Sequence, residues 1–86
     1  MKKFIYFTAA WCGPCKVLKP KIQALAEELP IDILDVDVNK EAAVSYGVRN
    51  IPAIIAVDAD GEVVERLVGN AITVEALKEL YKETSL

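Results

Sequence analysis

The first pattern along the chain is a short run of aromatic and β-branched residues over 2–8, which a turn-like Gly-Pro pair follows. This run predicts a buried β-strand. Over 14–29, apolar residues recur every three or four positions between lysines and glutamates, which predicts an amphipathic helix. Pro14 suits the first turn of this helix, and Pro20 falls inside it and predicts a kink. The expected apolar face consists of Val17, Leu18, Ile22, Leu25, Ala26 and Leu29.

A second strand and a short helix are expected next. Pro30 ends the first helix, and the strand is predicted over 31–38. Asn39 or its neighbour is able to cap a helix over 40–46, which Gly47 ends. The more apolar face of the strand consists of Leu34, Val36 and Val38.

The last third of the chain predicts a hairpin and a final helix. Segments 53–57 and 62–68 have strand character and flank the turn formed by 58–61, which contains Asp and Gly as such turns require. Gly69 ends the second strand. A helix begins at Ile72 or Thr73 and continues to about Glu83. Its expected buried stripe consists of Val74, Leu77, Leu80 and Tyr81.

The resulting order, β-α-β-α-β-β-α, predicts an α/β fold with one four-stranded mixed sheet and three helices on its two faces. Strands joined by a helix run parallel through a right-handed crossover, whereas the hairpin is antiparallel. In this arrangement the first strand ends where the first helix begins, at 11–15. That junction is the kind of crevice in which α/β sheets place their chemistry.

Composition limits the remaining choices. The 86 residues are 53% apolar and 27% charged, which suits a single domain over 1–86 that folds around one core. The formal net charge is −3 without a long run of either sign. We therefore expect neither a nucleic-acid ligand nor a polybasic membrane contact.

The amino-terminal ten residues imitate a secretory signal, with two lysines before an apolar stretch and small residues after it. The apolar part spans only Phe4 to Phe7, whereas a signal peptide needs roughly 7–15 apolar residues. Cleavage after Ala10 would also remove the first strand. The expectation is a cytoplasmic protein that keeps this segment and has no membrane span.

The two cysteines, Cys12 and Cys15, are three positions apart, and the chain contains no histidine. A structural zinc site requires about four nitrogen or sulfur ligands, and a disulfide closing so short a loop constrains the unfolded chain little. Reversible dithiol–disulfide chemistry is the remaining use of such a pair in a reducing compartment. Cys12, at the start of a helix, is the expected nucleophile because free N–H groups and the helix dipole favour its thiolate. Cys15, one turn inward, is the expected resolving thiol.

The neighbours of the cysteines also have expected roles. Gly13 allows close approach of a partner chain, and Pro14 makes the turn rigid. Lys16 adds positive potential, although a solvated surface lysine is the simpler interpretation.

At these residues the chain resembles the thioredoxin family. The string WCGPCK over 11–16 is that family's active-site sequence, and Pro20 stands five residues after the second cysteine, at the family's kink proline. The segment YGVRNIP over 46–52 is similar to the family's segment that ends in a cis-proline. Asp-Gly-Glu-Val at 60–63 and Val-Gly at 68–69 resemble its terminal hairpin.

The resemblance implies a thioredoxin fold and a protein-disulfide reductase that alternates between a Cys12/Cys15 dithiol and a disulfide. It implies no bound cofactor, because a flavin enzyme, thioredoxin reductase, returns electrons from NADPH. The implied partners are that reductase and disulfide-containing proteins. The chain itself is expected to be a monomer. It also implies a cis Ile51–Pro52 bond and an apolar substrate-contact surface made of Trp11, Gly13, Pro14, Val36, Ile51, Pro52, Val68 and Gly69.

The chain departs from the family pattern in three ways. The match begins after the strand and helix with which longer members open, so a four-stranded sheet is expected. The family's buried aspartate, six residues before the nucleophile, is replaced by Tyr6, and its neighbouring lysine by Ile33. Joint replacement is coherent, because losing one charge alone would leave a buried ion unpaired at a cost of several kcal/mol. Tyrosine is a poor base, so Cys15 is expected to be activated by water or by Asp35 or Asp37, acids that equally suit a solvated strand end.

Two other functions remain open from the sequence. A glutaredoxin-like reductase recharged by glutathione suits the short chain, but the Gly-Pro inside the motif and Val-Gly-Asn at 68–70 are closer to thioredoxin, and no cationic glutathione clamp is visible. A binding subunit of a larger enzyme, with incidental redox activity, is the second alternative.

Overall fold

The structure, a computed structural model, describes residues 3–84. Its elements follow the predicted order, with one short 3₁₀ helix, η1, added before the last helix. They are β1 (Lys3–Thr8), α1 (Gly13–Leu25), β2 (Ile31–Asp35), α2 (Lys40–Ser45), β3 (Ala53–Val57), β4 (Val63–Val68), η1 (Gly69–Ala71) and α3 (Val74–Thr84). The predicted first residue of β1, Lys2, lies outside the described residues.

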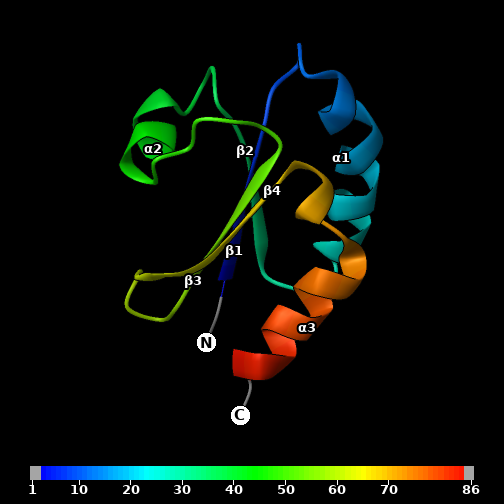
Figure 1. Ribbon diagram of the computed structural model, residues 1–86, viewed down its shortest axis with the longest axis vertical. Helices are drawn as coiled ribbons and strands as arrows, with labels where there is room; N and C mark the ends of the chain where they lie inside the picture. Colours follow the sequence, from blue (N-terminus) through cyan, green and yellow to red (C-terminus); the bar gives the residue numbers. More distant parts are fainter. Residues whose placement is uncertain (1–2, 85–86) are drawn as a thin grey trace.

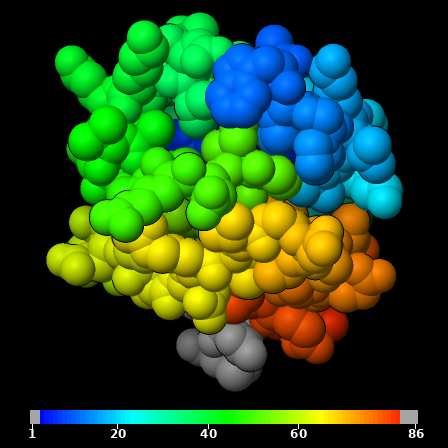
Figure 2. Space-filling model, turned by 45° about the horizontal axis from the view of Figure 1, so that its top comes forward, coloured from blue at the N-terminus to red at the C-terminus, as the bar shows by residue number. Residues whose placement is uncertain are grey.

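The four strands form one mixed sheet in the order β2-β1-β3-β4. β1 pairs parallel with β2 and antiparallel with β3, and β3 pairs antiparallel with β4. In Figure 1, α1 and α3 cover one face of the sheet and α2 covers the other. The predicted fold class is confirmed. The loops that follow β1 and β2 lie together at the top of Figure 1, and Figure 2 turns this end toward the viewer.

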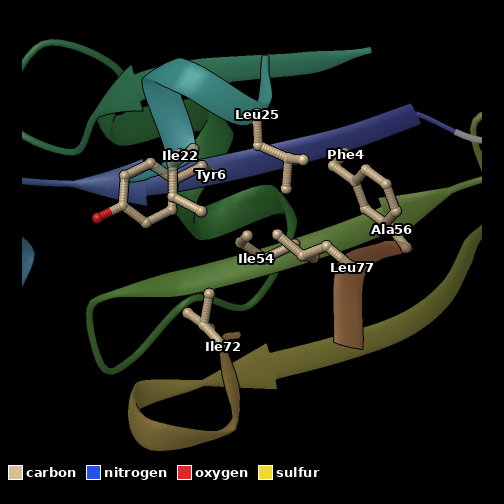
Figure 3. Packing of buried hydrophobic residues seen from close by; sticks show 8 residues of the cluster. All are labelled: Phe4, Tyr6, Ile22, Leu25, Ile54, Ala56, Ile72 and Leu77. Carbon is tan, nitrogen blue, oxygen red and sulfur yellow. The ribbon is translucent and has the colours of Figure 1, made fainter. Parts of the chain in front are cut away.

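Strand alternation divides the core into two layers. Side chains of β1 and β3 point alternately to the two faces. Those that face α1 and α3 form the cluster in Figure 3 together with side chains of these two helices and Ile72. It consists of Phe4, Tyr6, Ile22, Leu25, Ile54, Ala56, Ile72 and Leu77. The layer under α2 consists of Ile5, Phe7, Ala43, Ala53, Ile55 and Val57. The predicted stripe of α3 packs on the first layer, through Leu77 and the half-buried Val74, Leu80 and Tyr81.

The first helix ends at Leu25, one turn before the predicted end at Leu29. Its last turn tightens, because the N–H groups of Glu27 and Glu28 bond to carbonyls three residues earlier, at 3.3 and 2.9 Å. Such short-range bonds satisfy the last carbonyls of a helix, and Pro30 prevents the helix from continuing. Pro20 lies inside the helix as expected, and the kink there stays a prediction.

The second strand ends at Asp35, three residues before the predicted end at Val38. Oδ1 of Asp35 accepts the N–H of Asp37 at 2.7 Å, a local turn that aspartate favours. The Asp35 carbonyl also accepts the N–H groups of Val38 and Asn39. The chain therefore leaves the sheet here, and Val38, predicted on the apolar face, is 81% exposed.

The connections near the site are held by specific polar contacts. The carbonyl of Tyr46, at the end of α2, accepts a hydrogen bond from the Arg66 guanidinium of β4. Gly47, which ends α2 as predicted, has a φ of 68° that favours glycine. Thr73, just before α3, caps that helix through its Oγ1, which accepts the N–H of Ala76 at 3.0 Å.

Within residues 3–84, no helix has the length and apolar character that crossing a membrane requires.

Candidate active site

The start of α1 places both cysteines. Cys12 is the N-cap residue, with an extended backbone, and Pro14 occupies the first turn of the helix. The sulfur of Cys12 accepts the backbone N–H of Cys15 at 3.2 Å. The two residues form a disulfide with a Cα–Cα distance of 5.2 Å, inside the ordinary range for such bonds. The C-x-x-C spacing at a helix N-terminus therefore brings the sulfurs together without displacing the backbone.

The electrostatic setting favours negative charge on the sulfur of Cys12. The first turn of α1 contains no acidic residue, so the free N–H groups and the positive end of the helix dipole act on this sulfur unopposed from within the turn. Cys12 is 5% exposed and Cys15 is 1% exposed. Both cysteines are therefore buried, and Cys15 is the deeper of the two.

The indole of Trp11 lies on the surface beside the disulfide and is 67% exposed. Its Nε1 donates a hydrogen bond of 2.9 Å to Oδ2 of Asp37, a residue 26 positions away that lies in the turn after β2. This bond limits the orientations of the ring while its faces stay open to solvent. The sequence suggested Asp37 as one possible activator of Cys15. In the structure its carboxylate is hydrogen-bonded to the indole of Trp11.

The residues beneath the disulfide come from two other loops. Cys12 and Cys15 pack with Ala9, and half-buried Val36 and Ile51 pack against them. The Ile51–Pro52 peptide bond is cis. The loop before β3 therefore contacts the cysteine cluster through Ile51.

The end of β4 completes the site. The N–H of Gly69 donates a hydrogen bond of 3.0 Å to the carbonyl of Pro52, and its φ of 60° is one that favours glycine. Val68 is exposed beside it. In Figure 2 the blue segment around the first helical turn, the green segment near 50 and the yellow-orange segment near 70 meet on one face.

A groove of about 450 Å³ runs along this junction. It includes four of the predicted contact residues and five that were not predicted to contact a substrate. Its lining consists of Pro14, Val17, Leu18, Lys21, Ile51, Pro52, Gly69, Asn70 and Ile72. Val17 was predicted to be buried and is 69% exposed, because Cys15, Leu18, Ile22 and Leu25 occupy the buried stripe and Val17 lies off it. Counting the helical stripe from Cys15 would have found this.

Position 6, six residues before Cys12, has apolar surroundings. Tyr6 lies opposite Ile33 in the β1–β2 register. The two residues are therefore neighbours, as expected for positions that replace a neighbouring aspartate and lysine. The Tyr6 side chain is fully buried, and its hydroxyl forms no hydrogen bond of acceptable geometry with residues 3–84. Burial raises the pKa of the Tyr6 phenol above its ordinary value near 10, and the Thr8 hydroxyl lowers it by a smaller amount.

Ionisable side chains do not converge on a metal site in the described part of the chain. Among residues 3–84, no group of three or more His, Cys, Asp and Glu side chains is placed to hold a metal ion. The chemistry that this arrangement supports is the making and breaking of one sulfur–sulfur bond.

Comparison with known proteins points to one family. The family model described as thioredoxin matches residues 2–83. The thioredoxin of Bacillus subtilis (strain 168) is 47% identical over 81 residues, which cover 90% of this chain and 76% of that protein. The thioredoxin of Chlamydia muridarum is 50% identical over 66 residues, or 73% of this chain and 64% of that protein.

A solved structure agrees with these sequence matches. A mutant thioredoxin from Halobacterium salinarum NRC-1 superposes with a TM-score of 0.82 at 40% identity. The match covers 95% of this chain and 73% of that one. This chain therefore spans between about two thirds and three quarters of the length of these relatives.

Proposed function

Because the chain belongs to the thioredoxin family and has that family's disulfide at Cys12 and Cys15, we propose that it reduces disulfide bonds in other proteins. The single observation that supports this most strongly is the position of Cys12. Its sulfur caps α1 and accepts the N–H of Cys15, a position in which a thiolate is stabilised. A thiolate is the form of cysteine that attacks disulfides.

The proposed cycle has two steps. In the reduced protein, the Cys12 thiolate attacks one sulfur of a substrate disulfide, forms a mixed disulfide and releases the other substrate sulfur as a thiolate. The Cys15 thiolate then attacks the sulfur of Cys12, so that the Cys12–Cys15 bond forms and the second substrate sulfur leaves. Two electrons pass from the protein to the substrate, and no bound cofactor takes part.

The substrate is proposed to lie across the predicted contact surface. Exposed Trp11 and the backbone at Gly13 and Pro14 offer one side of it, and a Cβ added at Gly13 would meet no atom within 4 Å. The other side consists of Val36, Ile51, Pro52, Val68 and Gly69. An extended segment is proposed to pair with the backbone of the loop that contains the cis Ile51–Pro52 bond.

The proposed electron donor is NADPH acting through thioredoxin reductase. A glutathione-linked cycle is the competing route, and the Gly13–Pro14 pair and the Val68–Gly69–Asn70 segment favour the first route by their resemblance to thioredoxin. We further propose that the chain acts in the cytoplasm as a monomer, without binding nucleic acid or membranes, consistent with its formal net charge of −3.

The test is insulin reduction followed by turbidity. Wild type is assayed first with dithiothreitol, then with NADPH and thioredoxin reductase, then with glutathione and glutathione reductase. We expect rapid precipitation with the first two systems, little with the third, and none above background for Cys12→Ser. Insulin that stays soluble with wild type in all three systems would overturn the proposed function.

The non-catalytic alternative is separated by complementation. A binding subunit would keep its biological activity in the Cys12→Ser variant, because the fold and the apolar surface remain. Loss of that activity together with insulin reduction supports the reductase.

A further inference from the structure

The second step of the proposed cycle requires a thiolate at a buried sulfur. Cys15 is 1% exposed and packs against Ala9, Val36 and Ile51. Such apolar surroundings disfavour the charged form of a thiol, yet only the thiolate attacks the mixed disulfide. A group near Cys15 must therefore accept its proton, either directly or through water.

The strand beneath the cysteines does not supply this group. Tyr6 stands where the family has its buried acid, and its neutral phenol is a poor base, the more so because burial raises its pKa. Its cross-strand neighbours, Ile33 and Ile54, are apolar. The proton acceptor has to come from another direction.

A second cavity reaches Cys15 from a different side. It has a volume of about 180 Å³ and shares no lining residue with the substrate groove. Its lining consists of Thr8, Ala9, Ala10, Cys15, Lys16, Lys19 and Asp35. A water molecule occupies about 30 Å³ in the liquid, so this space, which the side chains of Thr8, Lys16, Lys19 and Asp35 line in part, has room for several waters next to Cys15.

Asp35 is the one carboxylate in this lining. It is the last residue of β2 and pairs with Thr8 of β1, so the sheet holds its backbone in place. Its Oδ1 accepts the N–H of Asp37 at 2.7 Å. Oδ2 has no hydrogen-bond partner among residues 3–84 and is free to bind water. Asp37, the other acid suggested by the sequence, does not line the cavity and is bound to Trp11.

We propose that Asp35 accepts the proton of Cys15 through water in this cavity, and so replaces the acid that the family places at position 6. This inference rests on the proposed function. The S–H proton passes through water to Asp35, and the Cys15 thiolate attacks Cys12. The Cys12–Cys15 bond forms, the bond to the substrate breaks, and the departing thiolate takes a proton from Asp35 or from solvent.

The charges around the cavity suit this transfer. Lys16 and Lys19 of α1 line it, and positive charge near a thiol favours the thiolate. Asp37, in the turn after β2, bonds to Asp35 through its backbone N–H, and its carboxylate is turned to the indole of Trp11. Thr8 of β1 adds an uncharged hydroxyl.

The experiment separates the two attacks in one reaction. The reduced protein is mixed with 5,5′-dithiobis(2-nitrobenzoate), and the release of thionitrobenzoate is followed by stopped-flow absorbance from pH 5 to 9. Attack by Cys12 gives the first phase and attack by Cys15 gives the second. Asp35→Asn is compared with wild type, since the amide oxygen still accepts the Asp37 N–H and the turn is kept. Asp60→Asn, in the exposed hairpin turn, is the matched control for loss of one negative charge.

We expect Asp35→Asn to slow the second phase by about 10- to 100-fold at pH 7, to make it rise steeply with pH, and to leave the first phase unchanged. Asp60→Asn should leave both phases within about twofold of wild type. A second phase of wild-type rate and pH dependence in Asp35→Asn overturns the inference, and so does an equal slowing in Asp60→Asn. Absence of the first phase in wild type would instead overturn the proposed function, and this inference with it.

Discussion

The buried hydroxyl of Tyr6 makes a prediction whose sign is unusual, because deleting a polar atom should stabilise the protein. Tyr6 is fully buried between β1 and the helices, next to Ile22 and Ile54 in Figure 3, and its oxygen points toward the carboxyl end of β1. That oxygen has no hydrogen-bond partner of acceptable geometry in the described part of the chain. A buried hydroxyl left unpaired costs about 1–3 kcal/mol.

Tyr6→Phe keeps the ring and removes only this oxygen. We expect the free energy of unfolding to rise by about 1 kcal/mol or more, and Tm by roughly 4–8 °C for each kcal/mol in a domain of this size. Urea and thermal denaturation of the oxidised protein measure both quantities. Tyr46→Phe is the control, because Tyr46 is only half-buried and its change should stay within about 0.5 kcal/mol. A Tyr6→Phe variant less stable than wild type by more than about 0.5 kcal/mol would refute the reasoning, since the hydroxyl would then be well bonded.

Three further outcomes follow from the fold. Burial raises the folded-state pKa of Tyr6, so its neutral phenol stabilises the folded state below about pH 10, and this stabilisation is lost as the pH rises further. In urea denaturation, the free energy of unfolding should therefore fall less at alkaline pH in Tyr6→Phe than in wild type. The hydrogen bond to Asp32 also raises the pKa of Lys3, so wild type and Tyr6→Phe should both still lose some stability at alkaline pH. Leu77→Ala should lower the free energy of unfolding by about 2–5 kcal/mol, because this fully buried side chain fixes α3 to the sheet; a loss under about 1 kcal/mol in urea denaturation would contradict that packing. Arg66→Met should cost about 1 kcal/mol, through its lost bond to the Tyr46 carbonyl, and hydrogen exchange should show weaker protection in α2; unchanged exchange there would speak against that contact.

The order of elements was predictable because each one has its own local pattern. The aromatic and β-branched run before the cysteines, the three- and four-residue spacing after Pro14, and the Asp-Gly turn each depend on neighbours a few positions away. The right-handed crossover and the hairpin then leave only a handful of possible topologies, and the strand order β2-β1-β3-β4 comes from the structure. The cysteine pair was predictable for the same reason, since residues three apart at a helix start are always close.

The errors occurred where polar backbone contacts compete with apolar pattern. Val36 and Val38 continue the alternation of β2. The chain turns there because the Asp35 carboxylate accepts the N–H of Asp37 and the Asp35 carbonyl accepts three further hydrogen bonds, one from Val38 and two from Asn39. An Asp whose side chain can bond the backbone N–H two residues on favours a turn, but the alternating valines favoured a continued strand. The bond between Trp11 and Asp37 joins residues 26 positions apart, and no local pattern reports such a contact.

The stabilised thiolate at Cys12 is the premise of the proposed cycle, and one titration tests it directly. In the reduced Cys15→Ser variant, Cys12 is the only thiol, and its rate of alkylation by iodoacetamide is measured from pH 4 to 10. We predict that the alkylation rate is half-maximal at least about one pH unit below the value near 8.5 of a free cysteine. A midpoint at or above 8.5 would contradict the account, because the helix would then give this sulfur no advantage as a nucleophile.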